Sequence, residues 1–398
     1  MELAERARRI NPSPTLTIDA RAKEMLAAGI NVLNFGAGEP DFDTPEHIRE
    51  AARQAIEQGL TRYTAVAGMP ALKKAIQEKL WRDNGLDYGV DQIVVSVGAK
   101  HSLYNAFQVL CQAGDEVILP SPYWVSYLEQ VRLAEAQVRL VTTRAENGFK
   151  LTPGELAAAI TPRSKVLVLN SPSNPTGAVY SRAELEALVP VVLRAGLTVI
   201  SDEIYEKLVY DGHEHVSIAA LGPEIKERTV LINGVSKAYA MTGWRLGYAA
   251  MPQAVACGMT SLQGHSTSNA ASVSQAAAIA ALNGTQEPTA RMVAEFAARR
   301  TCMLEKLQAV PGVSCFRPGG AFYLFPDVRA FWGRSYRGRP VTDATGLAAL
   351  LLDEVQLAVV PGIGFGNDNY IRLSYATDME TIREGMDRLS GFLGALAG

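Results

Sequence analysis

Residues 166–175 read Val166-Leu167-Val168-Leu169-Asn170-Ser171-Pro172-Ser173-Asn174-Pro175, an apolar run that stops abruptly at a polar cluster. Three more apolar runs stop in the same way, at the clusters 97–100, 200–205 and 232–237. In an open α/β sheet, ligands bind in the crevice beyond the carboxyl ends of the strands. We therefore expect the four clusters to line one pocket that contains a phosphate cradle, a buried acid and a lysine.

The middle of the chain alternates short β-rich runs with segments of helical length, such as 102–111 and 182–195. The expected strands are residues 93–97, 116–119, 166–169, 197–200, 229–232 and 246–250. This alternation predicts an α/β fold in which helices cover both faces of a mainly parallel sheet.

After Gly264 the sequence predicts a smaller α+β unit. This unit begins with long helices up to Gln308, and a hairpin with the turn Pro318-Gly319-Gly320 follows them. The hairpin strands are expected at 313–316 and 322–325, and the later elements are a helix at 345–354, strands at 357–360 and 370–375, and a helix at 379–396.

Composition agrees with a globular enzyme. The chain has 398 residues, 48% of them apolar, which is ample for a large core in two or three domains. A formal net charge of -3 gives no basis for a nucleic-acid partner. The four cysteines are scattered, and the N-terminus lacks the apolar core of a signal peptide. We therefore expect a cytoplasmic protein with no membrane partner and no metal site.

The most specific motif surrounds a lysine and reads Ser236-Lys237-Ala238-Tyr239-Ala240-Met241-Thr242-Gly243-Trp244-Arg245. Together with Asn174-Pro175-Thr176-Gly177 and Ser201-Asp202-Glu203-Ile204-Tyr205, it resembles the class I aminotransferases, which are pyridoxal-phosphate enzymes of the aspartate aminotransferase fold (fold type I). The resemblance extends from about Ser13 to the last helix, and it is strongest to bacterial aspartate and prephenate aminotransferases. It implies a large domain of residues 45–285 and a discontinuous small domain, 1–44 plus 286–398, that closes over the substrate.

Pyridoxal 5'-phosphate makes chemical demands that named residues can meet. Its aldehyde needs a lysine, which the resemblance assigns to Lys237, and the freed amine is then positioned to move the α-proton. The pyridine nitrogen needs a carboxylate, and Asp202 follows the apolar run 197–200. Tyr205 and Asn174 are expected to donate hydrogen bonds to the phenolic oxygen of the ring.

The phosphate of the cofactor needs amide N–H groups and cations. Gly98-Ala99-Lys100 stands between an expected strand and an expected helix, where free N–H groups and the helix dipole favour an anion. By resemblance, Ser236 and Arg245 are further phosphate ligands. Tyr63 matches a tyrosine that reaches the phosphate of the neighbouring subunit, which implies a homodimer with shared active sites.

The ring of the cofactor also needs a flat partner, and Trp124 matches the stacking position of the family. The preceding Pro122 and the place of Trp124 after the strand ending at Leu119 favour this role. In the family, Ser121-Pro122 and Asn174-Pro175 correspond to cis peptide bonds.

The substrate α-carboxylate is best held by a bidentate guanidinium, and Arg372 occupies the middle of an apolar strand. The backbone near Gly38 is expected to close over the same carboxylate. Lys100 can extend opposite Arg372 and suit a dicarboxylate, or it can serve only the phosphate or point to solvent. The predicted substrate residues are Ser13, Thr15, Gly38, Lys100, Trp124, Asn174 and Arg372, of which Ser13 and Thr15 match residues that close over substrate in the bacterial enzymes.

The sequence therefore predicts an aminotransferase that moves an amino group between aspartate or glutamate and a 2-oxo acid, with prephenate as a further candidate substrate. Two alternatives share the fold, namely a carbon-sulfur lyase and an aminotransferase for apolar or aromatic amino acids. A non-enzymatic regulatory module that binds the cofactor would need an added DNA-binding domain, for which the chain has neither length nor a basic patch. The hypothesis of a Rossmann-type dehydrogenase has still less support, because no G-x-G-x-x-G motif follows an expected strand.

Overall fold

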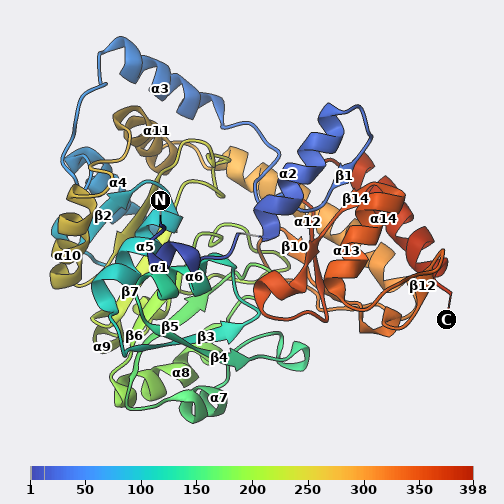
Figure 1. The fold of residues 1–398 in the computed structure, drawn as a ribbon. Helices are drawn as coiled ribbons and strands as arrows, with labels where there is room; N and C mark the ends of the chain where they lie inside the picture. Colours follow the sequence, from blue (N-terminus) through green and yellow to red (C-terminus); the bar gives the residue numbers. More distant parts are fainter. Residues whose placement is uncertain (1, 13, 398) are drawn as a thin grey trace.

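A computed structural model describes residues 2–12 and 14–397 (Figure 1). Within these residues, seven strands form one large sheet in the order β2-β8-β7-β6-β5-β3-β4. All neighbours are parallel except β8, which runs antiparallel to both β2 and β7. The strands are β2 (Ile93–Ser96), β3 (Glu116–Ser121), β4 (Gln137–Thr142), β5 (Ser164–Asn170), β6 (Thr198–Asp202), β7 (Thr229–Gly234) and β8 (Gly247–Ala250).

Helices cover both faces of this sheet because its strands bury alternate residues on opposite sides. Val166 and Val168 of β5 join the core that contains α5 and α6, whereas Leu167 and Leu169 pack into the core of α7 and α8. The predicted fold class, a mainly parallel sheet between two helical layers, is confirmed. The helices of this unit are α3 (Glu46–Glu57), α4 (Pro70–Asn84), α5 (Ala99–Leu110), α6 (Ser126–Leu133), α7 (Pro153–Ala159), α8 (Arg182–Ala195), α9 (Pro223–Lys226), α10 (Gln253–Gly264) and α11 (Ser272–Asn283).

The C-terminal third forms a second unit, and the N-terminal segment joins it. Strand β1 pairs in parallel with β14, and Figure 1 shows α2 in blue beside the orange and red C-terminal elements. This pairing supports our proposal of a discontinuous small domain, 1–44 plus 286–398. The helices are α2 (Pro14–Ala27), α12 (Glu287–Gln308), α13 (Ala344–Val355) and α14 (Met379–Gly394). Helix α1 (Glu5–Arg8) lies instead beside α5 and α6 of the large unit (Figure 1), where Asn11 donates a hydrogen bond to Glu129 of α6. The strands are β1 (Leu33–Asn34), β9 (Ser314–Cys315), β10 (Tyr323–Leu324), β11 (Pro326–Asp327), β12 (Ser335–Tyr336), β13 (Arg339–Pro340), β14 (Leu357–Ala358), β15 (Val360–Pro361) and β16 (Ile371–Ser374).

The predicted hairpin of residues 313–316 and 322–325 is wrong. Strand β9 pairs with β11, while β10 pairs with β16. Residues 322–325 are almost completely buried, so they need an internal strand partner, and β16 provides one. Among the described residues, none of the helices combines the length and apolarity needed to cross a membrane.

Candidate active site

The four polar clusters meet at one pocket of about 430 Å³. Its walls come from the ends of β5, β6 and β7, the start of α5, the segment after β1, and β16. The pocket therefore lies where the carboxyl ends of the parallel strands face the C-terminal unit. Its lining includes the predicted residues Gly38, Ala99, Lys100, Trp124, Asn174, Asp202, Tyr205, Ser236, Lys237, Arg245 and Arg372.

Of the other predicted residues, Gly98 directly precedes the lining residue Ala99, and three lie elsewhere or outside the described part of the chain. Tyr63 is 91% exposed and borders a separate surface hollow with Arg62 and Asn269. Ser13 lies outside the described residues. Thr15 belongs to the backbone of α2, near its first residue.

Lys237 follows β7, and its ammonium donates a hydrogen bond to the carbonyl oxygen of Gly38. Burial lowers the pKa of Lys237 to about 8. Glu39 opposes this shift, whereas the cations of Arg372, Arg245 and Lys100 add to it. A lysine with this pKa supplies neutral amine near physiological pH, as a nucleophile or a general base requires.

Asp202 ends β6 and is 4% exposed. Its two carboxylate oxygens have different partners: Oδ2 accepts from the Tyr127 hydroxyl at 2.6 Å, and Oδ1 accepts from the Ile204 N–H at 3.2 Å. Burial raises the pKa of Asp202 to about 6, and these two hydrogen bonds oppose the rise. The site therefore keeps a buried carboxylate that is ionised at neutral pH.

Arg372, in the middle of β16, is 2% exposed. Nη1 donates to Asn174 Oδ1 at 3.1 Å and Nη2 to the Gly36 carbonyl at 2.8 Å, while the guanidinium lies 4.4 Å from the Tyr323 ring centroid. Nε has no hydrogen-bond partner in the described part of the chain, and the partners of the two Nη atoms there are uncharged oxygens and not carboxylates. A buried cation without a counter-ion is costly, so this group is suited to bind an anionic ligand.

Tyr205 presents a protonated hydroxyl to the pocket. Burial raises its pKa well above the ordinary value, with the neighbouring Tyr323 adding to the shift. The two hydroxyl groups lie 2.9 Å apart. Tyr323 lines the pocket but was not predicted, because its contact with Tyr205 joins residues 118 positions apart in the chain.

The start of α5 and Arg245 form the cationic end of the pocket. Gly98 has φ 87°, and a Cβ there would lie 2.6 Å from Arg245 Nη2, so glycine lets the guanidinium approach the loop. Arg245 itself has φ 51°, in the left-handed region, a strain that often occurs at functional sites. With the free N–H groups of the first helical turn, these groups provide a cradle for an anion.

The ammonium of Lys100 lies 4.9 Å from the ring centroid of Trp124, a cation–π geometry. Burial lowers the pKa of Lys100, and Arg245 adds to this shift. Both side chains line the pocket, so Lys100 does not simply point to solvent.

The backbone around Trp124 and Asn174 is also as expected. The cis peptide bonds predicted at Ser121-Pro122 and Asn174-Pro175 are confirmed, and Ser171-Pro172 is a third.

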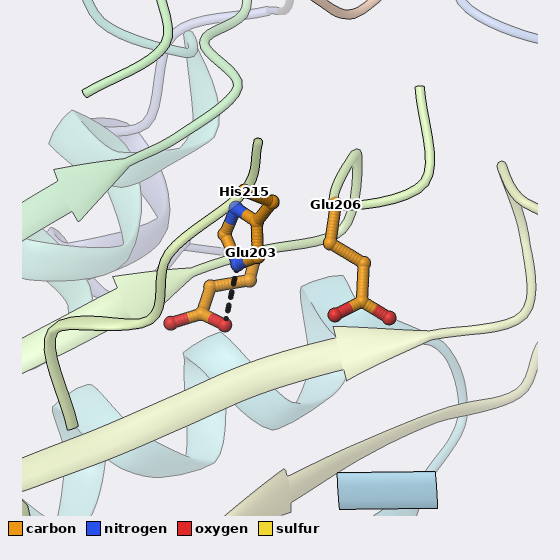
Figure 2. A group of neighbouring side chains, drawn as sticks. All are labelled: Glu203, Glu206 and His215. Atoms are coloured by element: carbon orange, nitrogen blue, oxygen red, sulfur yellow. Dashed lines mark hydrogen bonds and ion pairs between the residues drawn. The ribbon is translucent and has the colours of Figure 1, made fainter. Parts of the chain in front are cut away.

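Next to Asp202 in sequence, Glu203 belongs to a buried charge network with Glu206 and His215 (Figure 2). Glu203 contacts His215 Nε2 at 2.9 Å and accepts from two serine hydroxyls, while Glu206 pairs with the buried Lys79. Their possible ligand atoms lie within 4.8 Å of one another. Because protein partners already satisfy both carboxylates, we interpret the cluster as an ion-pair network and not as a metal centre.

Comparisons with known proteins give one consistent result. The model of the family described as aminotransferase class I and II matches residues 30–389. An aspartate aminotransferase of Geobacillus stearothermophilus is 51% identical over 397 residues, with 100% of both chains covered. An aspartate/prephenate aminotransferase of Cereibacter sphaeroides is 47% identical, with 99% of each chain covered.

Solved structures show the same similarity in three dimensions. The aspartate aminotransferase of Rhizobium meliloti superimposes with a TM-score of 0.96 at 44% identity, over 100% of both chains. The aspartate aminotransferase of Thermus thermophilus, determined with maleate, gives a TM-score of 0.92 at 42% identity and covers 98% of this chain and 100% of that one.

Proposed function

The chain belongs to the family of class I and II aminotransferases, and we propose that it is a pyridoxal-phosphate enzyme that moves an amino group between aspartate or glutamate and a 2-oxo acid. One observation carries the proposal: a single pocket combines the amine of Lys237, the buried carboxylate of Asp202 and two cationic ends. One cationic end is formed by Arg245 and the start of α5, and the other by Arg372.

The donor groups of the pocket fit pyridoxal phosphate. Asp202 would hold the pyridine nitrogen, and Tyr205 and Asn174 would donate to the phenolic oxygen. The Asn174 amide is available as a donor because Oδ1 already accepts from Arg372. The phosphate would bind to Gly98, Ala99, Lys100, Ser236 and Arg245, and Trp124 would lie against the ring. When bound, pyridoxal phosphate supplies an electron sink conjugated to the amino group.

With the cofactor bound, three residues of the chain would have separate roles in the reaction. Arg372 binds the α-carboxylate and orients the amino acid, with Gly38 and Trp124 closing around it. Lys237 Nζ accepts the proton of the substrate α-carbon, because its lowered pKa keeps a neutral amine available. Asp202 stabilises positive charge at the far end of the pocket as negative charge develops at the α-carbon.

The preference for a dicarboxylate rests on Lys100. Its ammonium stands over Trp124 in the same pocket as Arg372, so the two cations can bind the two carboxylates of one substrate. The Thermus thermophilus relative was solved with maleate, which is a dicarboxylate. Prephenate remains a candidate because the Cereibacter sphaeroides relative is named for both substrates. Ser13 and Thr15 are proposed to close over the substrate, as the sequence predicts.

We propose that the protein is a homodimer in which the Tyr63 hydroxyl donates a hydrogen bond to the cofactor phosphate in the pocket of the partner subunit. A tyrosine that is 91% exposed beside a surface hollow supports such a role. We further propose that residues 45–285 form the large domain. The four cysteines are free thiols, which fits the proposed cytoplasmic location.

Spectral titration of the purified protein with single amino acids tests the function. Aspartate and glutamate should convert the visible band of bound cofactor to the pyridoxamine band without an acceptor present, and Lys237→Ala should not respond. An aminotransferase stops after this one half-reaction, whereas a carbon-sulfur lyase turns over and releases its amino group as ammonia. Continuous ammonia release, or conversion by apolar amino acids alone, would overturn the proposal.

A further inference from the structure

Tyr127 lies in the first turn of α6 and is 1% exposed. It touches two groups that the proposed function assigns to the cofactor. Its hydroxyl donates to Asp202 Oδ2 at 2.6 Å, and its ring packs edge-on against Trp124 with centroids 5.4 Å apart and planes at 81°. The residue therefore joins the expected partner of the pyridine nitrogen to the expected stacking ring.

We propose that Tyr127 is a positioning residue that holds the Asp202 carboxylate ionised and oriented for the pyridine nitrogen, and that its ring keeps Trp124 in place for stacking. This inference rests on the proposed function. It assigns to Tyr127 a role that acts through Asp202 and not by contact with substrate.

The geometry supports a fixed orientation. Each oxygen of Asp202 accepts one hydrogen bond inside the protein, from Tyr127 and from the Ile204 N–H. Two donors on two oxygens fix both the position and the plane of a carboxylate, whereas one donor would leave it free to rotate. Each oxygen keeps lone-pair capacity for a further donor from the pocket.

The electrostatic surroundings explain why the carboxylate needs this donor. Burial favours the protonated form of Asp202, and the adjacent Glu203 carboxylate acts in the same direction. Tyr127, the Ile204 N–H and Lys237 act in the opposite direction. The titratable or charged groups that act on Asp202 are Tyr127 from α6, the adjacent Glu203, and Lys237 after β7; Asp202 in turn raises the pKa of Tyr205.

Substitution of the hydroxyl alone gives the first test. Tyr127→Phe keeps the ring against Trp124 and removes the donor to Asp202. Pyridoxal phosphate is titrated into the cofactor-free apoprotein between pH 4.5 and 8.5, and binding is followed by tryptophan fluorescence and absorbance. We expect about tenfold weaker binding at neutral pH, and the acid midpoint of binding should move upward by about one pH unit because the charged carboxylate has lost a donor.

The matched control is Tyr180→Phe. Tyr180 is also buried, and its hydroxyl accepts the N–H of Leu151 at 2.7 Å, away from the pocket. The thermal stability of Tyr180→Phe should fall by about as much as that of Tyr127→Phe, but its acid midpoint for binding of pyridoxal phosphate should equal that of the wild-type protein. If the acid midpoint of binding shifts equally in Tyr127→Phe and Tyr180→Phe, Tyr127 contributes only to stability and the inference is overturned.

Coupling to Asp202 gives the second test. In an Asp202→Asn background, Tyr127→Phe should no longer move the midpoint, because the titrating group is gone. If Tyr127→Phe is too unstable, 3-fluorotyrosine at position 127 replaces it. This near-isosteric and more acidic donor should move the midpoint downward, and an unchanged midpoint would overturn the inference.

The outcomes separate the inference from the proposed function. Failure of the wild-type protein to bind pyridoxal phosphate, or normal binding by Asp202→Asn, would overturn the proposed function itself. Normal binding and an unchanged midpoint in Tyr127→Phe, with impaired binding in Asp202→Asn, would overturn only the role of Tyr127.

Discussion

At the scale of single residues, the pocket holds an excess of positive charge. Lys237, Lys100, Arg245 and Arg372 all line it beside the carboxylate of Asp202. Of these cations, Arg372 is buried and Lys237 is half-buried, whereas Lys100 and Arg245 are exposed. A buried charge without a counter-ion is unfavourable, so an anionic ligand should stabilise the Arg372 end of the pocket. Burial, and then the neighbouring cations, lower the pKa of Lys237, and the proposed chemistry uses the resulting neutral amine.

The buried, ionised carboxylate of Asp202 should lower the free energy of unfolding. Its pKa is about 6 in the folded protein and about 3.9 in an unfolded chain. The folded state therefore binds the extra proton between about pH 4 and pH 6, and wild-type stability falls as the pH rises through this window. Asp202→Asn should stabilise the apoprotein at neutral pH by about 3 kcal/mol and have little effect near pH 4.

Denaturant unfolding of both apoproteins at pH 4 and pH 7.5 measures this difference. Asp202→Asn should bind pyridoxal phosphate more weakly while it unfolds at higher denaturant, which is a trade of stability for function. Equal stability of the two proteins at pH 7.5 would contradict the expected burial of a charged Asp202.

Lys100 should determine the preference for dicarboxylates. Lys100→Met removes a charge-assisted contact of about 1.5 to 3 kcal/mol, so kcat/KM for aspartate should fall by about one to two powers of ten. Activity toward an apolar amino acid should change much less. Lys74→Met, at an exposed lysine of α4, controls for the loss of one charge. Equal losses for both substrates would show that Lys100 serves only the cofactor.

At the scale of elements, the phosphate cradle depends on the close approach of α5, Arg245 and β8. A Cβ on Gly247 of β8 would lie 2.2 Å from the Ala99 nitrogen, so glycine allows the helix to begin against the strand. The same closeness at Gly98 brings the guanidinium of Arg245 to the loop. The anion site is thus formed by packing between a helix start and a strand.

Gly98→Ala tests this packing, and Gly114→Ala is its matched control. Both glycines have positive φ, 87° and 94°, but an added Cβ meets Arg245 at Gly98 and nothing within 4 Å at Gly114. Both variants should lose about 1 kcal/mol to backbone strain. Only Gly98→Ala should also weaken binding of pyridoxal phosphate, by about tenfold or more, as measured by fluorescence titration. Similar affinities in the two variants would argue against a cradle at Gly98.

Strands and helices with a strong local pattern were predicted well from the sequence. The apolar runs of β5, β6 and β7 and the helix α8 lie where they were expected, within a few residues. Strand β4 was missed because it is an edge strand, four of whose six residues are exposed, so it lacks a continuous apolar run. The pairing of β10 was wrong because the sequence shows a turn but not which distant strand, here β16, covers a buried segment.

The same limit applies to the site. Motif residues such as Lys237 and Asn174 could be predicted because they follow apolar runs or match the family pattern. Tyr127 could not, because its contact with Asp202 joins residues 75 positions apart in the chain. Its only local signal is a tyrosine three residues after Trp124, at a spacing that is equally typical of a buried helix face.

At the scale of the whole molecule, the exposed Tyr63 is the best argument for assembly. Its side chain is 91% exposed, whereas most tyrosines of this chain are buried. The hollow beside it is formed by residues 61–63 together with 267, 269 and 271–273, which join two segments far apart in sequence. Such a surface fits a twofold interface in which each subunit completes the site of the other.

Mixed dimers test the sharing of sites. Lys237→Ala damages its own pocket, whereas Tyr63→Ala should damage the pocket of its partner. When the two inactive or impaired variants exchange subunits, each mixed dimer contains one pocket with both wild-type residues. A 1:1 mixture should therefore recover about one quarter of wild-type transamination, since half of the dimers are mixed and each has one intact site.

The control mixture of Lys237→Ala with Asp202→Ala should recover nothing, because both changes damage their own pocket and no intact site can form. Subunit exchange is verified by mass spectrometry of the intact dimers. No recovery in the test mixture after verified exchange would show that Tyr63 acts within its own subunit, and full activity of Tyr63→Ala by itself would show that Tyr63 has no role in either site.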